Sequence, residues 1–404
     1  MPSTLLLLPP APHPPTYAAL KAAYHAPLAP LLRSLATPPP PAAASAPRPT
    51  LDIALPLPLL ATRRGAPRAA LFAPTQKALA ALYRLVASIG AKERLCVEGD
   101  EGLDVRVVLL AMGRGGEDEG QEYGSAVVGL EGLARCAARW DDVVGVEGEE
   151  GERVLRAFLS RVRGGDVSVR RVKGGIVSVD AKAEEQFGRE GFEDVPKHFW
   201  VANGGTFDHL HIGHKLLLTM TVFMIDEGDE SQQRNVTIGI TAEDLLKNKK
   251  YADFLESWDE RQKSVHKFIR GIMCFEEPEK DREEIIEHRD PGPNGHILQI
   301  RLPSNISLLY TEIWDPFGPT ITKEEISALV ISEETRKGGK AVNDKRKDVG
   351  FKSLEVFEVD VLDAEDEDRD IKLPEGAEKQ FLGKLSSTEL RKARSERVGS
   401  KSKT

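Results

Sequence analysis

The stretch GGTFDHLHIGH at residues 204–214 decides the fold of the second half of this chain. It lies between an apolar run at 198–202 and an apolar helical pattern at 215–225. This order predicts a strand, a glycine turn and a helix. Gly204 and Gly205 allow a sharp turn and a close approach to a ligand, because neither residue carries a Cβ.

The start of that helix has the properties of an anion site. Unpaired N–H groups and a partial positive charge favour phosphate at a helix N-terminus. His211 and His214 share a helical face there, and imidazoles donate hydrogen bonds to phosphate. Gly213 leaves room for a ring or a phosphate beside the backbone. Taken alone, these residues fit an ordinary turn with surface histidines equally well.

Composition sets limits on the class of protein. A chain of 404 residues with 40% apolar content predicts two globular domains. The net charge of −9 argues against a general affinity for nucleic acid or for anionic membranes. Cys96, Cys136 and Cys274 show neither a disulfide framework nor metal-ligand spacing, which favours a reducing compartment.

We expect no secretory signal peptide at the N-terminus. The apolar run Leu5 to Leu8 has four residues and is followed by Pro9 and Pro10, whereas a secretory signal needs about 7–15 apolar residues. No window approaches the roughly 20 apolar residues of a membrane span. We therefore expect a cytoplasmic protein that binds no membrane.

The composition changes along the chain predict its domains. We expect a partly flexible Pro- and Ala-rich arm at 1–50, a small α/β or α+β domain of unknown role at 51–180, and a linker at 181–196. A nucleotide-binding domain then occupies 197–395, and a flexible tail occupies 396–404. No chemical motif is found in the first domain.

The second half alternates strand and helix patterns. Strands are expected at 199–202, 235–240, 296–302, 307–313, 328–331 and 354–362, and helices at 213–226, 258–274, 340–348 and from Ser387. Glu324 and Glu325 are expected to open a short helix, and 276–294 a charged surface loop. Such alternation predicts a Rossmann-like α/β domain with a parallel sheet, whose ligands lie at the carboxyl ends of the strands.

Four further segments fall at predicted strand ends or at a helix start. They are LKNKK at 246–250, DPFGPT at 315–320, SEETRKGGK at 332–340 and LSSTELR at 385–391. In the last, Ser386, Ser387 or Thr388 can cap a helix whose free N–H groups face an anion. Each segment alone also fits an ordinary turn, charged loop or helix cap.

Together, residues 205–214, 315–319, 332–335 and 386–388 resemble the eukaryotic and archaeal phosphopantetheine adenylyltransferases. These belong to the nucleotidyltransferases with an H-x-G-H motif, here residues 211–214. The resemblance covers about residues 197–395 and includes Asn343 and Arg346. In animals this activity is fused to a dephospho-coenzyme A kinase, which would require a Gly-x-x-x-x-Gly-Lys-Ser/Thr loop. The given sequence contains no such loop, and in this it resembles the monofunctional fungal enzymes.

The resemblance implies transfer of the adenylyl group of ATP to 4′-phosphopantetheine, with Mg²⁺ accompanying ATP and no metal cage of protein ligands. It implies His214, Lys249, Thr206 and His211 as catalytic residues, although Lys247 or Lys250 can replace Lys249 in the match. The implied ATP contacts are Gly205, Thr206, Phe207, His211, Gly213, His214, Arg336, Ser386, Ser387 and Thr388. The implied substrate contacts are Thr206, Lys249 and Asp315.

Two alternatives stay open. One is another adenylyltransferase, such as a nicotinamide mononucleotide adenylyltransferase, because that family pairs a histidine motif with a similar Ser-x-Thr-x-x-Arg ending. The other is a catalytically silent nucleotide-binding scaffold of a coenzyme A biosynthetic complex. A monofunctional enzyme would hand its product to a separate dephospho-coenzyme A kinase, so that kinase and other enzymes of the pathway are the expected protein partners.

Overall fold

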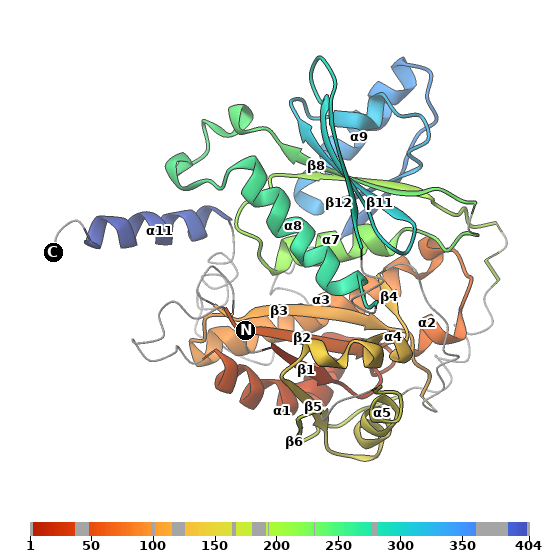
Figure 1. Ribbon diagram of the computed structural model, residues 1–404, viewed down its shortest axis with the longest axis vertical. Helices are drawn as coiled ribbons and strands as arrows, with labels where there is room; N and C mark the ends of the chain where they lie inside the picture. The colour runs from red at the N-terminus through yellow and green to blue at the C-terminus, as the bar shows by residue number, and fades with distance from the viewer. Residues whose placement is uncertain are drawn as a thin grey trace.

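Two parallel-dominated sheets form the protein, one in each half of the chain (Figure 1). The computed structural model describes residues 3–36, 48–97, 102–114, 126–163, 167–179, 191–192, 194–229, 231–276, 282–360 and 387–401. The Rossmann-like α/β class predicted for the second half is confirmed, and the first half is also α/β.

The N-terminal sheet is parallel in all its described pairings, with the order β4-β3-β2-β1-β5-β6. Its strands are β1 (Ser3–Leu7), β2 (Thr50–Pro56), β3 (Asp104–Leu110), β4 (Val127–Val128), β5 (Asp142–Val146) and β6 (Val169–Val172). Its helices are α1 (Tyr17–Leu35), α2 (Pro58–Thr62), α3 (Arg68–Glu93), α4 (Leu130–Arg135) and α5 (Glu149–Leu159).

Helices cover both faces of this sheet. Leu6 belongs to the apolar cluster that contains α1 and α3, whereas Leu5 and Leu7 belong to the cluster that contains α4 and α5. Successive side chains of a strand point to opposite faces, so a strand covered on both sides reads as a continuous apolar run. The run that opens the chain is therefore a central strand.

This result corrects the interpretation of residues 1–50 as a partly flexible arm. Residues 3–7 form the strand β1 between β2 and β5, and residues 17–35 form α1, capped by Thr16, which accepts from the Ala19 N–H at 3.2 Å. Prolines at 27 and 30 lie inside that helix and hid its pattern. Pro38 to Pro41 lie outside the described residues, as do 181–190 and 193 of the predicted linker.

The C-terminal sheet has the order β13-β12-β7-β8-β11-β10-β9. Its strands are β7 (Trp200–Gly205), β8 (Arg234–Thr241), β9 (Glu284–Arg289), β10 (His296–Arg301), β11 (Ile306–Ile313), β12 (Ala328–Ser332) and β13 (Glu355–Val359). Its longer helices are α7 (Ile212–Phe223), α8 (Trp258–Met273), α9 (Arg336–Asp348) and α11 (Ser387–Lys401). The strands from β13 to β11 are parallel, and β10 and β9 add an antiparallel edge.

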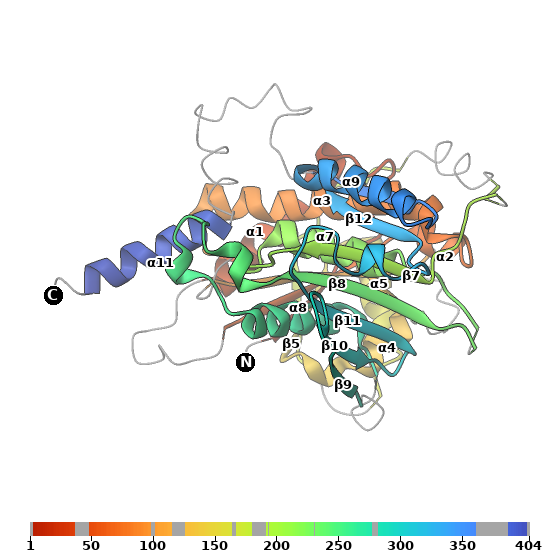
Figure 2. The ribbon, with the colours of Figure 1, turned by 90° about the horizontal axis from the view of Figure 1, so that it is seen from above.

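Three sequence expectations for this half are wrong. The predicted loop at 276–294 contains the edge strand β9, paired with β10. Glu324 and Glu325 lie in a turn and open no helix, because the carbonyl groups of this turn bond to Arg346. Residues 396–401 of the predicted tail continue α11, which extends away from the rest of the chain in both ribbon views (Figure 2).

The two sheets share one apolar core. A single cluster contains Leu82 and Val86 of α3 together with Leu216 of α7 and Ile269 of α8. Residues 215–223 of α7 are all buried. None of the described helices combines the length and the apolar character needed to cross a membrane.

Deletion of residues 1–190 should therefore prevent cooperative folding of the remainder, because it uncovers the side of α7 that α3 covers. Thermal unfolding followed by circular dichroism measures this. Deletion of residues 396–404 is the matched control and should leave the unfolding midpoint unchanged. A fragment 191–404 that unfolds cooperatively at the midpoint of the full chain would contradict the shared core.

Candidate active site

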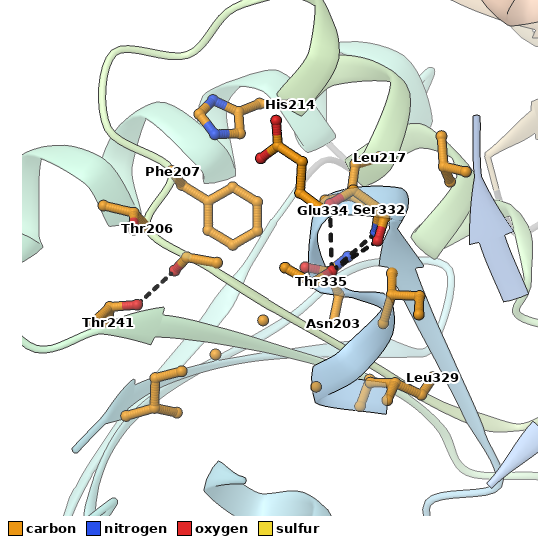
Figure 3. A pocket seen from close by; sticks show the side chains of 18 of the residues that line it. Asn203, Thr206, Phe207, His214, Leu217, Thr241, Leu329, Ser332, Glu334 and Thr335 are labelled. Atoms are coloured by element: carbon orange, nitrogen blue, oxygen red, sulfur yellow. Dashed lines mark hydrogen bonds between the residues drawn. The ribbon is translucent and has the colours of Figure 1, made fainter. Parts of the chain in front are cut away.

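A cavity of about 1200 Å³ lies at the carboxyl ends of β7, β8, β11 and β12 (Figure 3). Much of its wall is formed by residues 204–207 and 316–320 and by Ile331, Ser332, Glu334, Thr335, Gly338 and Gly339. The predicted site residues that line it are Gly205, Thr206, Phe207, His211, Gly213, His214, Lys249, Ser387 and Thr388. Ser386 lies outside the described residues.

The turn between β7 and α7 holds an unusual conformation. Phe207 and His209 have φ angles of 53° and 48°, in the left-handed region that costs energy for residues with a Cβ. The buried Phe207 ring lies under Gly205, where a Cβ would come within 3.0 to 3.3 Å of the ring atoms. A side chain at 205 would therefore press against this buried ring, and both Gly205 and Phe207 line the cavity.

The two histidines form a stacked pair at the start of α7. His211 precedes the first helical residue and His214 lies in the first turn, with ring centroids 4.0 Å apart and planes 28° from parallel. A Cβ on Gly213 would come within 3.1 Å of the His211 ring, so glycine makes room for the stack. His214 Nδ1 is buried and has no hydrogen-bond partner among the described residues.

Both imidazoles are neutral at pH 7. Burial lowers the pKa of His214 to about 4, against the opposing effect of the Asp208 carboxylate. Burial also lowers the pKa of His211 well below the usual value, and the neighbouring His214 and Lys215 add to that shift. Each ring therefore offers one N–H donor and no net charge to a ligand.

A buried ion pair joins α11 to this turn. Asp208 and Arg391 are both buried and form an ion pair between the Asp208 carboxylate and the guanidinium. The Ser387 hydroxyl donates to the Asp208 carbonyl at 2.8 Å, and the Glu256 N–H donates to its carboxylate at 3.0 Å. These bonds bring Ser387 and Thr388 to the cavity beside the histidines.

The structure separates the three candidate lysines. Lys249 lines the cavity. Lys247 pairs with Asp244 on the surface, and the carbonyl of Lys250 accepts from Arg391 Nε at 3.0 Å. The arrangement favours Lys249 as the lysine that meets a ligand, and its catalytic role stays a prediction.

Two predicted residues lie outside the cavity wall. The Asp315 carboxylate accepts from the N–H groups of Phe317 and Gly318 at 2.7 and 2.8 Å and from the Asn294 amide at 2.7 Å, so it shapes the turn. The exposed Arg336 pairs with Glu358. Neither is among the described residues that line the cavity, so this geometry does not support direct ligand contact by either one.

Two buried arginines that hold the walls escaped the sequence analysis in this role. Arg261 donates to the carbonyl groups of Thr206, Thr241 and Glu256 at 2.8 to 3.0 Å. Arg346 donates to five carbonyl groups, those of Thr320, Lys323, Glu324, Ile326 and Lys352. Arg261 shares the buried face of α8 with Val265 and Phe268, a position where an arginine needs a polar partner.

Further lining residues were missed. Asn203, Thr241, Glu334 and Arg391 line the cavity, and Glu334 extends toward the side that holds His214 (Figure 3). Arg391 follows Thr388 by three residues on one helix face, and this spacing was the available signal. Asn203 and Thr241 sit inside or at the end of strands, where the sequence gives no sign of the cavity.

One group of potential metal ligands makes hydrogen bonds and an ion pair within the protein. Asp208, His209 and Glu256 lie close together. However, Asp208 pairs with Arg391, Glu256 accepts from the His209 N–H at 2.7 Å, and His209 Nε2 lies 3.0 Å from the Phe254 carbonyl. These contacts hold the turn between β7 and α7 to the segment that contains Phe254 and Glu256.

The sheet order, with a cavity at the carboxyl ends of the strands that is bordered by the starts of two helices, defines a Rossmann-like α/β domain. Comparison with known proteins identifies the family to which the chain belongs. A phosphopantetheine adenylyltransferase of Pyrococcus abyssi is 30% identical over 40% of this chain and 78% of its own length. The chain belongs to the phosphopantetheine adenylyltransferase family.

Other relatives match smaller shares of their own length. A phosphopantetheine adenylyltransferase of Saccharomyces cerevisiae is 32% identical over 50% of this chain and 51% of its own. An uncharacterized protein of Schizosaccharomyces pombe is 35% identical over 40% of this chain and 39% of its own. The chain thus spans about half or less of the length of these two relatives.

The N-terminal half matches a different family. Residues 1–178 match a domain of unknown function (DUF8446).

Among solved structures, a protein of unknown function from Archaeoglobus fulgidus is 22% identical to this chain, with a TM-score of 0.27, and the match covers 40% of this chain and 98% of that protein.

The low pKa of His214 predicts an acid-sensitive fold. The folded protein binds fewer protons than the unfolded chain between about pH 6.5 and pH 4, so the free energy of unfolding should fall as the pH falls through this window. Urea unfolding at a series of pH values measures the slope, and His214→Asn should reduce it. Titration of His214 near pH 6.5 by NMR would contradict the burial argument.

Proposed function

We propose that the C-terminal domain transfers the adenylyl group of ATP to 4′-phosphopantetheine, giving dephospho-coenzyme A and pyrophosphate. The observation that carries the proposal is the meeting of His211, His214, Lys249 and the start of α11 at one cavity. Family relatives carry the name of this activity. The proposed compartment is the cytoplasm, and the product would pass to a separate dephospho-coenzyme A kinase.

The reaction asks little covalent chemistry of the protein. A phosphate oxygen of the acceptor attacks the α-phosphorus in line, the new O–P bond forms, and the bond to the β-phosphate oxygen breaks as pyrophosphate leaves. Positioning and stabilisation of charge carry such a transfer. The acceptor phosphate is deprotonated at neutral pH, so no general base is required.

Four of the lining residues have proposed roles in the transfer. His214 donates to the α- or β-phosphate, and His211 assists on the triphosphate. Thr206 orients the acceptor phosphate, and Lys249 neutralises charge on the acceptor or the α-phosphate. Bound phosphates raise the pKa of both imidazoles, because an opposite charge favours the protonated ring.

The start of α11 would hold the far phosphates. Thr388 would present its hydroxyl, and Ser387 and Thr388 their free N–H groups, to the β- and γ-phosphates, as proposed also for Ser386. The Ser387 hydroxyl would first have to leave the Asp208 carbonyl to which it donates. Arg336 would have to leave Glu358 before it could reach the triphosphate. The substrate contact proposed for Asp315 would likewise require its turn to rearrange.

Mg²⁺ is expected to accompany ATP. Two described carboxylates line the cavity, those of Glu334 and Asp360, and the Asp360 carboxylate accepts from Gln76 at 2.7 Å. This donor set fits an ion held chiefly by phosphate oxygens and water, to which the Glu334 carboxylate could add a ligand. The ion would reduce the charge that develops on the leaving pyrophosphate.

The acceptor distinguishes this proposal from its nearest rival. Purified protein offered ATP and 4′-phosphopantetheine should release pyrophosphate, and it should release none with nicotinamide mononucleotide. An enzyme-coupled pyrophosphate assay measures both. Release with nicotinamide mononucleotide alone would identify a different adenylyltransferase, and release with neither acceptor would favour a silent nucleotide-binding scaffold.

Replacement of His214 should separate binding from turnover. His214→Ala should bind ATP within a few-fold of the parent and lose about 10²- to 10³-fold in kcat, the scale of one lost transition-state donor. Lys249→Ala should also lower kcat, whereas the surface variant Lys247→Ala is the matched control. Parental turnover by His214→Ala would remove His214 from the mechanism.

A further inference from the structure

The helix that carries the histidines is fastened to the N-terminal domain at its first turn. Lys215 directly follows His214 and its side chain is buried. Its ammonium donates to the Asp104 carboxylate and to the Val105 carbonyl, both at 2.9 Å. Asp104 and Val105 belong to β3, so a residue of the first domain holds the turn that presents the imidazoles.

A second fastening lies at the other end of α7. The Asp226 carboxylate is buried and accepts from the His198 N–H at 2.6 Å and from the Arg68 N–H at 2.8 Å. His198 precedes β7, and Arg68 begins α3 of the first domain. The Arg68 guanidinium also pairs with Glu227 at 2.8 Å.

Between these ends α7 has no solvent-facing side. Every residue from 215 to 223 is buried, and α3 packs on the helix. A surface helix of an α/β domain normally keeps a polar face toward water. The sequence of α7 is therefore that of a helix enclosed between two domains.

The first domain also reaches the cavity wall. Gln76 of α3 donates to the Asp360 carboxylate at 2.7 Å and accepts from the Asp360 N–H at 3.0 Å. Asp360 follows β13 and lines the cavity. Two separate parts of the site thus depend on contacts from the N-terminal half.

We propose that the N-terminal domain is a positioning element of the active site, and that Lys215, through its pair with Asp104, is a positioning residue for His211 and His214. Because an unpaired buried ammonium is costly, these bonds fix the position of the start of α7 relative to β3. A displacement of about 1 Å at a reacting group can lower turnover by about 10²-fold. This proposal rests on the proposed adenylyl transfer.

The charge of Lys215 provides a second readout. It lies beside His211 and contributes, after burial and His214, to the lowered pKa of that ring. Removal of the ammonium should raise the pKa of His211, whereas a general loss of stability should leave it where it is. His209 contributes in the same direction and stays in place in the variant.

The variant Lys215→Met tests the proposal in the full-length protein. Arg106 and Arg48, besides Lys215, lower the pKa of the half-buried Asp104, so the carboxylate keeps cationic neighbours and the fold should survive. We expect kcat to fall about 10- to 100-fold with the dissociation constant for ATP within a few-fold. NMR titration should show a raised pKa for His211. The double variant Lys215→Met/Asp104→Asn should recover part of the lost unfolding midpoint, but its kcat should stay low.

Glu227→Gln is the matched control, since it removes an interdomain ion pair at the far end of the same helix. It should lower the unfolding midpoint and leave kcat and the pKa of His211 unchanged. A kcat of Lys215→Met equal to that of the parent would overturn the proposal. So would losses of kcat that are proportional to the loss of unfolding midpoint in both Lys215→Met and Glu227→Gln. If the parent transfers no adenylyl group to any acceptor, the proposed function fails, and an unchanged pKa of His211 in Lys215→Met would still overturn the positioning role.

Discussion

Backbone carbonyl groups at the carboxyl ends of the C-terminal strands impose the constraint on which the site depends. The loops that leave these strands form no ladder there, and a buried carbonyl needs a donor. Arg261 supplies donors to the loops after β7 and β8, and Arg346 supplies them to the turn at 320–326. The walls of the cavity are thus held in place by guanidinium groups that bond to their backbone carbonyls and need not contact a ligand.

This support bears on how an acidic chain could hold the anion that we propose as its ligand. The cavity offers neutral imidazoles, hydroxyl groups and the starts of α7 and α11, and its described lining includes one lysine, Lys249, and an arginine already paired with Asp208. The phosphate binding that we propose would therefore depend mainly on oriented N–H and O–H groups. The net charge of −9 is therefore compatible with a site for a polyanion.

The sequence predicted the elements whose patterns are local. The alternation of strands and helices, the turn at 204–214 and the start of α11 all have such patterns, and nine of the named site residues line one cavity. It failed for β1 and α1, where prolines obscured the apolar runs, and for β9, whose charged side chains resemble a loop. Lys215 and Asp104 could not be paired from sequence, because their contact depends on how two domains meet.

The docking of α11 has a consequence for the order in which the molecule is completed. Among the described residues, its first turn supplies Ser387, Thr388 and Arg391 to a cavity whose other lining residues all precede residue 361. On a ribosome, both sheets can therefore assemble before this part of the wall has left the exit tunnel. A nascent chain would keep the cavity open on that side until residues 387–391 have emerged, which separates the folding of the sheets in time from the completion of the cavity.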